Sequence, residues 1–132
     1  MAQSQPLAAD VLNVNCLSRT VLRHLTDRWT PMIVAVLAQG ERVRFTDIRA
    51  RVQGISPKVL TETLRSMERD GLLRREVTAS VPPRVDYQLT EMGASTVEPL
   101  AALRQWAERN VDEVLEHRAR YDESQDVRVP LG

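Results

Sequence analysis

The sequence predicts a mainly α-helical domain with one small β-hairpin and with added helices at both ends. Three observations support this fold class. Apolar residues recur at three- and four-residue spacing over most of the chain, the period of an amphipathic helix. Residues 72–78 are predicted to form a strand, and residues 85–89 alternate apolar and polar side chains, as expected for its partner strand. The segment between them, residues 79–84, contains Pro82 and Pro83 and is predicted to be a loop.

Length and composition bound the organisation. The 132 residues suit one domain, predicted over residues 16–123, with a flexible arm over residues 1–15 and a flexible tail over residues 124–132. One cysteine excludes an intrachain disulfide, and the two histidines lack metal-ligand spacing, so we expect no metal and no cofactor. No apolar run approaches the roughly 20 residues that span a bilayer. We therefore expect a soluble, cytoplasmic protein without a membrane partner.

Two helices are predicted in the first third of the chain. The first covers residues 17–26, and its apolar face consists of Leu17, Val21 and Leu25. The second covers residues 30–39 and ends at Gly40. It is strongly apolar, through Met32, Ile33, Val36 and Leu37, so it is expected at the centre of the domain.

A short helix, a turn and a longer helix follow. The short helix opens at Phe45 with Thr46 as its expected cap, and residues 53–55 form the turn. Ser56 suits the N-cap of the longer helix, Pro57 its first position, and Gly71 its end. The buried face is predicted to contain Leu60, Leu64 and Met67, and the opposite face Lys58, Thr61, Glu62, Arg65 and Arg69. This is a helix-turn-helix pattern, to which the hairpin adds a wing.

Charge is divided unevenly along a chain whose formal net charge is zero. Residues 42–75 contain nine basic and four acidic side chains, whereas residues 86–126 contain four basic and ten acidic ones. The basic middle segment indicates a surface that faces a polyanion, here double-stranded DNA, with solvated surface charge as the alternative. The predicted DNA-binding residues are Arg44, Arg49, Ser56, Pro57, Lys58, Thr61, Glu62, Arg65, Arg69 and Arg84.

The last helical region begins at Thr90, bends near Gly93 and Pro99, and continues toward Tyr121. Its apolar stripe is longer than a small domain needs for its own core, so we expect self-association. The predicted dimer interface comprises Leu17, Val21, Leu100, Leu103, Trp106, Ala107, Val111 and Val114.

Cys16 is the one residue with reactive chemistry to consider. It precedes the first helix and lies near Arg19 in sequence, an arrangement that favours the thiolate and hence redox sensing. The alternative is a small buried apolar residue. Trp29 and Trp106 suit the core or an interface better than stacking on an effector. His24 and His117 lack the partners of a catalytic triad, so no enzymatic activity is expected.

Several ordered motifs make the chain resemble the HxlR type of winged helix-turn-helix transcriptional regulators, within the broader MarR-like group. The resemblance spans roughly Cys16 to Trp106. It rests on Cys16 and on residues 27–30 (DRWT), 44–48 (RFTDI), 54–61 (GISPKVLT), 64–72 (LRSMERDGL), 81–87 (VPPRVDY) and 89–93 (LTEMG). The chain departs from the family pattern at Glu62 and Thr63, where Gln and a basic residue are common, and at Leu17, where a proline often follows the cysteine.

The resemblance implies a homodimer that binds inverted repeats near promoters, tuned by oxidation of a cysteine at the position of Cys16 or by an unidentified small-molecule effector. From the residues alone, a two-fold dimer of this kind would present two recognition helices about one DNA turn apart. One rival hypothesis is a winged-helix module that binds proteins and never touches DNA. A thiol-based redox enzyme is the other.

Overall fold

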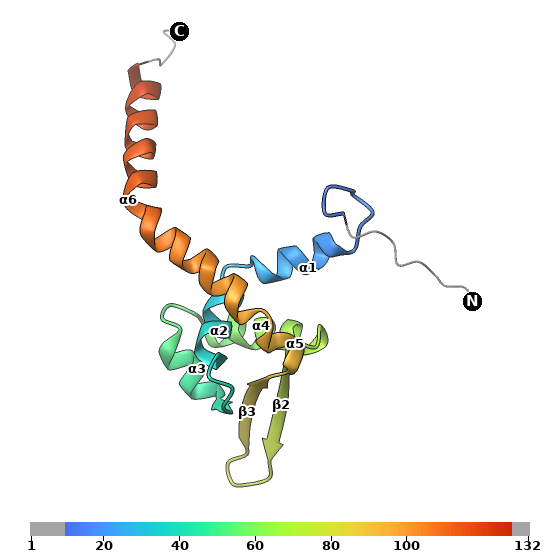
Figure 1. Ribbon diagram of the computed structural model, residues 1–132. Helices are drawn as coiled ribbons and strands as arrows, with labels where there is room; N and C mark the ends of the chain where they lie inside the picture. Colours follow the sequence, from blue (N-terminus) through green and yellow to red (C-terminus); the bar gives the residue numbers. More distant parts are fainter. Residues whose placement is uncertain (1–9, 128–132) are drawn as a thin grey trace, which may run out of the picture. The chain divides into compact units, whose positions relative to one another are not determined.

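The computed structural model describes residues 10–127 and divides into two compact units, one ending at Leu100 and the other beginning at Ala101. Within the described residues, the first unit contains the whole sheet and the shorter helices (Figure 1). The second unit consists of most of the last helix. The predicted fold class, mainly helical with a small antiparallel sheet, is confirmed.

Helix α2 (Thr30–Leu37) lies at the centre of the first unit and follows α1 (Ser18–Leu25). A proline in the first turn of α2 is tolerated because that turn has no N–H partner to lose. Ile33 and Leu37 are completely buried, as the sequence predicts, whereas Met32 is 44% exposed. Gly40, with φ of 83°, turns the chain after α2.

Helices α3 (Phe45–Arg51) and α4 (Pro57–Arg69) form the predicted helix-turn-helix. The turn uses Gly54, whose φ of 91° favours glycine. Ser56 caps α4 as predicted, because its side-chain oxygen accepts a hydrogen bond from the Val59 N–H at 3.2 Å. Gly71, with φ of 79°, ends the helix.

The start of α3 differs from the prediction. The N-cap position belongs to Arg44, not Thr46, and no side chain caps this helix. Thr46 instead lies inside the first turn. The reason is that α3 begins directly at the end of a short strand, β1 (Val43–Arg44), so that Arg44 keeps an extended backbone and supplies the cap position.

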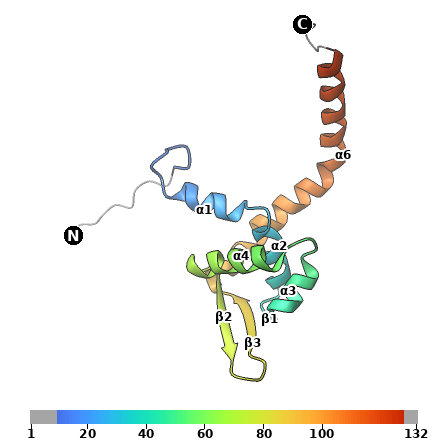
Figure 2. The same ribbon diagram turned by 180° about the vertical axis from the view of Figure 1, so that it is seen from behind.

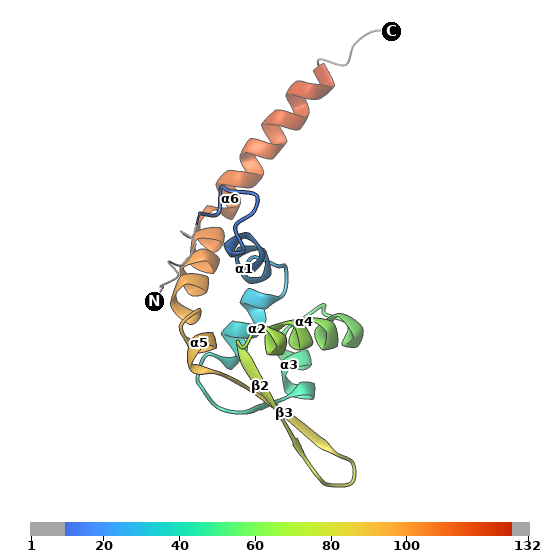
Figure 3. The same cartoon turned by 90° about the vertical axis from the view of Figure 1, so that its right-hand side faces the viewer.

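Strands β2 (Leu73–Thr78) and β3 (Arg84–Leu89) form the predicted hairpin, which extends away from α2 and α4 (Figure 3). Strand β1 pairs with the other edge of β3, giving the order β1-β3-β2. The sequence does not predict β1, because two residues cannot display an alternation. Its pairing sets Arg44 opposite Asp86, at the base of the wing.

The core of the first unit is shared by α2, α3, α4 and the sheet. Its fully buried side chains include Ile33, Val34, Leu37, Ile48, Leu60 and Met67. Each such side chain stabilises the fold by about 1.5–3 kcal/mol relative to exposure. Because α4 buries only this face, its opposite face is exposed where the helix lies across the base of the hairpin (Figure 2).

Helix α5 (Glu91–Ala94) is held against the end of α4. Thr90 caps it by accepting a hydrogen bond from the Gly93 N–H at 3.0 Å, and its hydroxyl donates to the Gly71 carbonyl at 2.6 Å. The predicted interruption is present between α5 and α6 (Val97–Val127), so Pro99 falls in the first turn of α6. The bend therefore precedes the proline.

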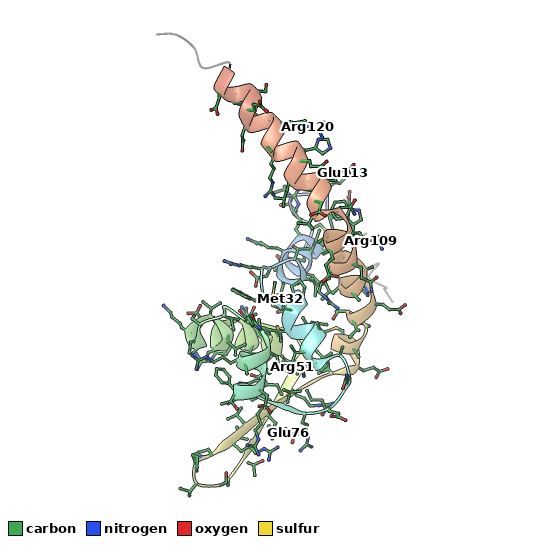
Figure 4. The ribbon with its side chains drawn as sticks, turned by 90° about the vertical axis from the view of Figure 1, so that its left-hand side faces the viewer. Met32, Arg51, Glu76, Arg109, Glu113 and Arg120 are labelled. Atoms are coloured by element: carbon green, nitrogen blue, oxygen red, sulfur yellow. The ribbon has the colours of Figure 1, made fainter. Side chains whose placement is uncertain are left out.

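Helix α6 runs beyond the predicted boundary at residue 124 and ends at Val127. Charged residues along it, among them Arg109, Glu113 and Arg120, project from its surface (Figure 4). The outer parts of the predicted arm and tail, residues 1–9 and 128–132, lie outside the described residues. No helix in the described part of the chain is long and apolar enough to cross a membrane.

Candidate nucleic-acid interface

A hollow of about 760 Å³ lies between the start of α3, the first half of α4 and the hairpin. Three arginines line it, Arg44, Arg75 and Arg84. Its hydroxyl groups come from Thr46, Thr61, Thr78, Ser80 and Tyr87. Within the described chain, no aspartate or glutamate belongs to this lining. Phe45, Pro82, Pro83 and Val85 complete the lining with apolar surface. The guanidinium and hydroxyl donors among the lining residues are suited to phosphate groups.

The exposed face of α4 adjoins this hollow. Lys58 and Arg65 lie on it, and neither forms an ion pair with any residue between 10 and 127. Thr61 is half-buried at the edge of the face and lines the hollow, which makes the two surfaces continuous. The first turn of α4, after Ser56 and Pro57, adds the positive end of the helix dipole. The face therefore offers unpaired cations next to a cationic hollow.

Arg84 lies at the wing end of the hollow and is held by Asp86. Its Nε atom lies 3.1 Å from Oδ2 and 3.2 Å from Oδ1 of that carboxylate. Asp86 is only 4% exposed, whereas the Arg84 side chain is 46% exposed. The loop before Arg84 contains a cis peptide bond between Val81 and Pro82.

Arg75 and Tyr87 also line the hollow, although neither was predicted from the sequence to bind DNA. The Arg75 Nε atom lies 3.5 Å from Oε1 of Glu68, which ties β2 to α4. Burial raises the pKa of the Tyr87 phenol, and the positive charge of Arg75 acts against that rise. Strand alternation could have identified both residues, because they share one face of the hairpin in register with each other.

Two of the predicted residues lie at the other edge of α4. Glu62 and Arg69 line a separate polar cavity of about 390 Å³ between α1 and α4. That cavity also contains the contact between the His24 Nε2 and Asp70 Oδ2 atoms, at 3.6 Å. The predicted set is thus divided: Arg44, Thr61 and Arg84 surround the hollow, whereas Glu62 and Arg69 face α1.

Arg49 is exposed on α3 and does not line the hollow. It also has no ion-pair partner within residues 10–127. This places it apart from the cluster formed by the hollow and the α4 face.

Cys16 is half-buried just before α1. The pKa of its thiol is lowered, chiefly by a hydrogen bond with the Ser18 hydroxyl, whose oxygen lies 2.7 Å from Sγ, and further by the backbone N–H groups of Ser18 and Asp10. Arg19 does not contribute to this shift. Its guanidinium instead donates to the carbonyls of Val11 and Leu12 at 2.7 and 3.0 Å. Hydrogen bonds, rather than a neighbouring cation, therefore favour the thiolate.

Most of the predicted dimer-interface residues are solvent-exposed within the chain. Leu17 and Val21 of the first unit are 78% and 56% exposed. The stripe on α6 is exposed at Leu103, Trp106, Ala107 and Val111 and half-buried at Val114. Leu100 differs from the prediction of an interface residue, because it is 4% exposed and packs in the core of the first unit.

Other side chains with potential chemistry have structural roles. Trp29 packs against the core, and the Arg28 guanidinium lies 4.8 Å from the centre of its ring. Among residues 10–127, no group of three or more His, Cys, Asp or Glu side chains could hold a metal ion.

The order of α2, α3, α4 and the β2–β3 hairpin defines a winged helix-turn-helix protein, with α4 as the recognition helix of that class. The model of the HxlR-like helix-turn-helix family matches residues 24–115. The chain belongs to this family, whose members are helix-turn-helix transcriptional regulators and not enzymes.

Individual relatives agree with the family match. The chain is 44% identical over 100 residues to the uncharacterized HTH-type transcriptional regulator YtfH of Escherichia coli K12, covering 76% of this chain and 79% of that one. The structure of a putative transcriptional regulator, ytfH from Salmonella typhimurium, is similar with a TM-score of 0.77 and 39% identity, covering 84% and 98%. The redox regulator HypR in its oxidized form has a TM-score of 0.64 and 32% identity, covering 72% and 97%.

Proposed function

We propose that this transcriptional regulator binds double-stranded DNA as a homodimer, with α4 in the major groove and the hairpin against the flanking backbone. The observation that carries the proposal is the continuity of the exposed Lys58 and Arg65 face with a hollow whose lining, within residues 10–127, contains no carboxylate. Arg65 has the planar fork that can bond O6 and N7 of guanine together. Arg44, Arg75 and Arg84 supply charge for phosphates. We also propose that the protein is cytoplasmic, which its similarity to the HTH-type transcriptional regulator of Escherichia coli supports.

The rival hypothesis, a protein-binding module, needs an apolar exposed patch on the recognition helix. Within residues 10–127, the large apolar side chains that are exposed lie on other elements, and none of them belongs to α4. This favours DNA as the partner of that face.

The homodimer is supported by the exposed apolar residues of α1 and α6. Within the described part of the chain, Trp106 is 54% exposed and Val111 is 47% exposed, although both are large apolar side chains. A second copy of the chain would cover these residues and pair two recognition helices. Sedimentation should show a dimer, and Trp106→Glu should shift it toward monomer.

We propose that oxidation of Cys16 regulates DNA binding. Two Cys16 thiols, one from each subunit, would give up two protons and two electrons to hydrogen peroxide, forming one disulfide bond and two water molecules. The lowered pKa of Cys16 supports this step, as does the similarity to the redox regulator HypR. Cys16→Ser should remove the response to peroxide and leave the affinity of the untreated protein for DNA nearly unchanged.

Fluorescence anisotropy with a labelled duplex from the chain's own upstream region tests the main proposal. We expect tight binding to an inverted repeat and a loss of roughly 10³-fold or more between 50 and 200 mM salt if six or more phosphates are contacted. A folded dimer that binds no duplex even at low salt would contradict it.

A further inference from the structure

We propose that Asp86 is a positioning residue for DNA binding, which holds the Arg84 guanidinium at the wing end of the hollow with its phosphate-binding edge free. This inference rests on the proposed DNA-binding function. Its starting point is the contact between the Arg84 Nε atom and both oxygens of the Asp86 carboxylate, at 3.1 and 3.2 Å.

The contact uses one particular side of the guanidinium. Arg84 has five N–H donors, and among the described residues only the one on Nε has a hydrogen-bond partner. The four donors on the two Nη nitrogens remain available at the end of the side chain, which is 46% exposed. That end presents the pair of parallel donors that binds a phosphate in a bidentate manner.

The two residues are fixed by the strand. Positions 84 and 86 lie on the same face of β3, because side chains alternate along a strand. Both are in the ladder with β2, where Arg84 is opposite Thr78 and Asp86 is opposite Glu76. The wing arginine is therefore attached to a rigid ladder position and not only to the loop that precedes it.

The stability of the fold does not by itself explain why position 86 is an aspartate. Its carboxylate is 4% exposed, and burial of a charge is unfavourable unless a partner compensates for it. It is also placed directly across the ladder from a second carboxylate, Glu76, and like charges in that position repel. Glu76 forms its own ion pair with Arg42, at 2.9 Å. Arg44 lies opposite Asp86 on β1 and adds positive charge nearby, but among the described residues the ion pair of Asp86 is with Arg84.

Two effects of removing the Asp86 charge have opposite signs. By simple electrostatics, one fewer negative charge near a DNA-binding surface should tighten binding. If Asp86 positions Arg84, the same change should weaken binding, because the arginine then loses its fixed orientation before it meets a phosphate. The direction of the change in affinity therefore distinguishes the two roles.

The test compares Asp86→Asn with Glu76→Gln, which removes the same charge from the opposite residue on the same face of the sheet. Figure 4 labels Glu76 on the hairpin. We expect Asp86→Asn to weaken DNA binding roughly five- to tenfold, the scale of one ordinary hydrogen bond. Glu76→Gln should leave the affinity unchanged or raise it. Equal or tighter binding by Asp86→Asn would overturn the inference.

A double-mutant cycle separates positioning from a structural role. In an Arg84→Ala background, Asp86→Asn should have no further effect on DNA affinity, because there is no arginine left to hold. An equal loss in both backgrounds would show that Asp86 acts on the fold, and would overturn the inference.

Nuclear magnetic resonance of the native chain covers the case in which Asp86→Asn fails to fold. The Arg84 Nε–H resonance should be protected from exchange with water before and after DNA is added, whereas its Nη–H resonances should change on DNA binding. An unprotected Nε–H signal would overturn the inference. Failure of the native chain to bind any duplex would instead reject the proposed function itself, so the two failures are distinguishable.

Discussion

The Nε2 atom of His24 lies 3.6 Å from the Oδ2 atom of Asp70, which connects α1 to the residue that follows α4. The His24 side chain is 11% exposed, whereas that of Asp70 is 44% exposed. Nε2 of His24 is buried and has no hydrogen-bond partner in the described part of the chain. The contact links a helix predicted to form the dimer with the end of the recognition helix.

The unequal burial of this pair predicts unequal effects of mutation. His24→Ala should lower the free energy of unfolding by about 1–3 kcal/mol, mainly through lost packing. Asp70→Asn should cost less than about 1 kcal/mol, because an exposed partner is screened by water. Urea unfolding measures both, with the exposed His117→Ala as the control. A larger loss for Asp70→Asn than for His24→Ala would contradict this assignment.

The close approach of Gly93 to the backbone of Leu72 predicts a second effect on stability. A Cβ atom at this position would overlap the backbone carbonyl oxygen of Leu72, and a backbone atom cannot rotate away as a side chain can. Gly93→Ala should therefore cost about 1–3 kcal/mol or more through overpacking. Gly40→Ala is the matched control: nothing lies within 4 Å of its added Cβ, so only its positive φ opposes the change, at about 1–2 kcal/mol. Thermal unfolding should rank Gly93→Ala as the more damaging.

Arg65 should contribute to sequence discrimination. Arg65→Ala is expected to weaken binding to the cognate duplex by about 1–3 kcal/mol and to weaken binding to random DNA less, because base-edge contacts are lost only on the cognate site. Arg49→Ala, an exposed arginine outside the hollow, serves as the control and should change both affinities little. Equal losses on the two duplexes would reduce Arg65 to a phosphate contact.

The lowered pKa of Cys16 predicts how the reactivity of its thiol changes with pH. Because the folded chain favours the thiolate, alkylation by iodoacetamide should rise with pH at a lower midpoint in the folded protein than in urea. The Ser18 side chain is the largest cause of the shift, so Ser18→Ala should move the midpoint upward. If the folded and unfolded midpoints coincide, these hydrogen bonds do not activate the thiol.

The sequence predicted the helix-turn-helix well because its signals are local. Ser56 and Pro57 mark the start of α4, Gly71 marks its end, and the buried face follows from helical spacing. Strand β1 could not be predicted in this way. It has two residues, and its pairing partner, Tyr87 for Val43, lies far along the chain.

Local sequence signals were also insufficient to predict the candidate site in full. The spacing of α4 predicted which residues are exposed, but it could not show that Glu62 faces α1 while Thr61 faces the wing. Leu100 was assigned to the dimer stripe because periodicity identifies an apolar face without showing what covers it. The contact of Arg84 with Asp86 was within reach of the sequence, since residues two apart share a strand face.

The arginine-lined hollow belongs to a chain with a pI near 6.7 and an acid-rich last helix. Near neutral pH, little net repulsion keeps one molecule away from another, while the basic recess of one can attract the acidic helix of its neighbour. Dilute buffer should therefore promote clustering of the DNA-free protein, and added sodium chloride should disperse it.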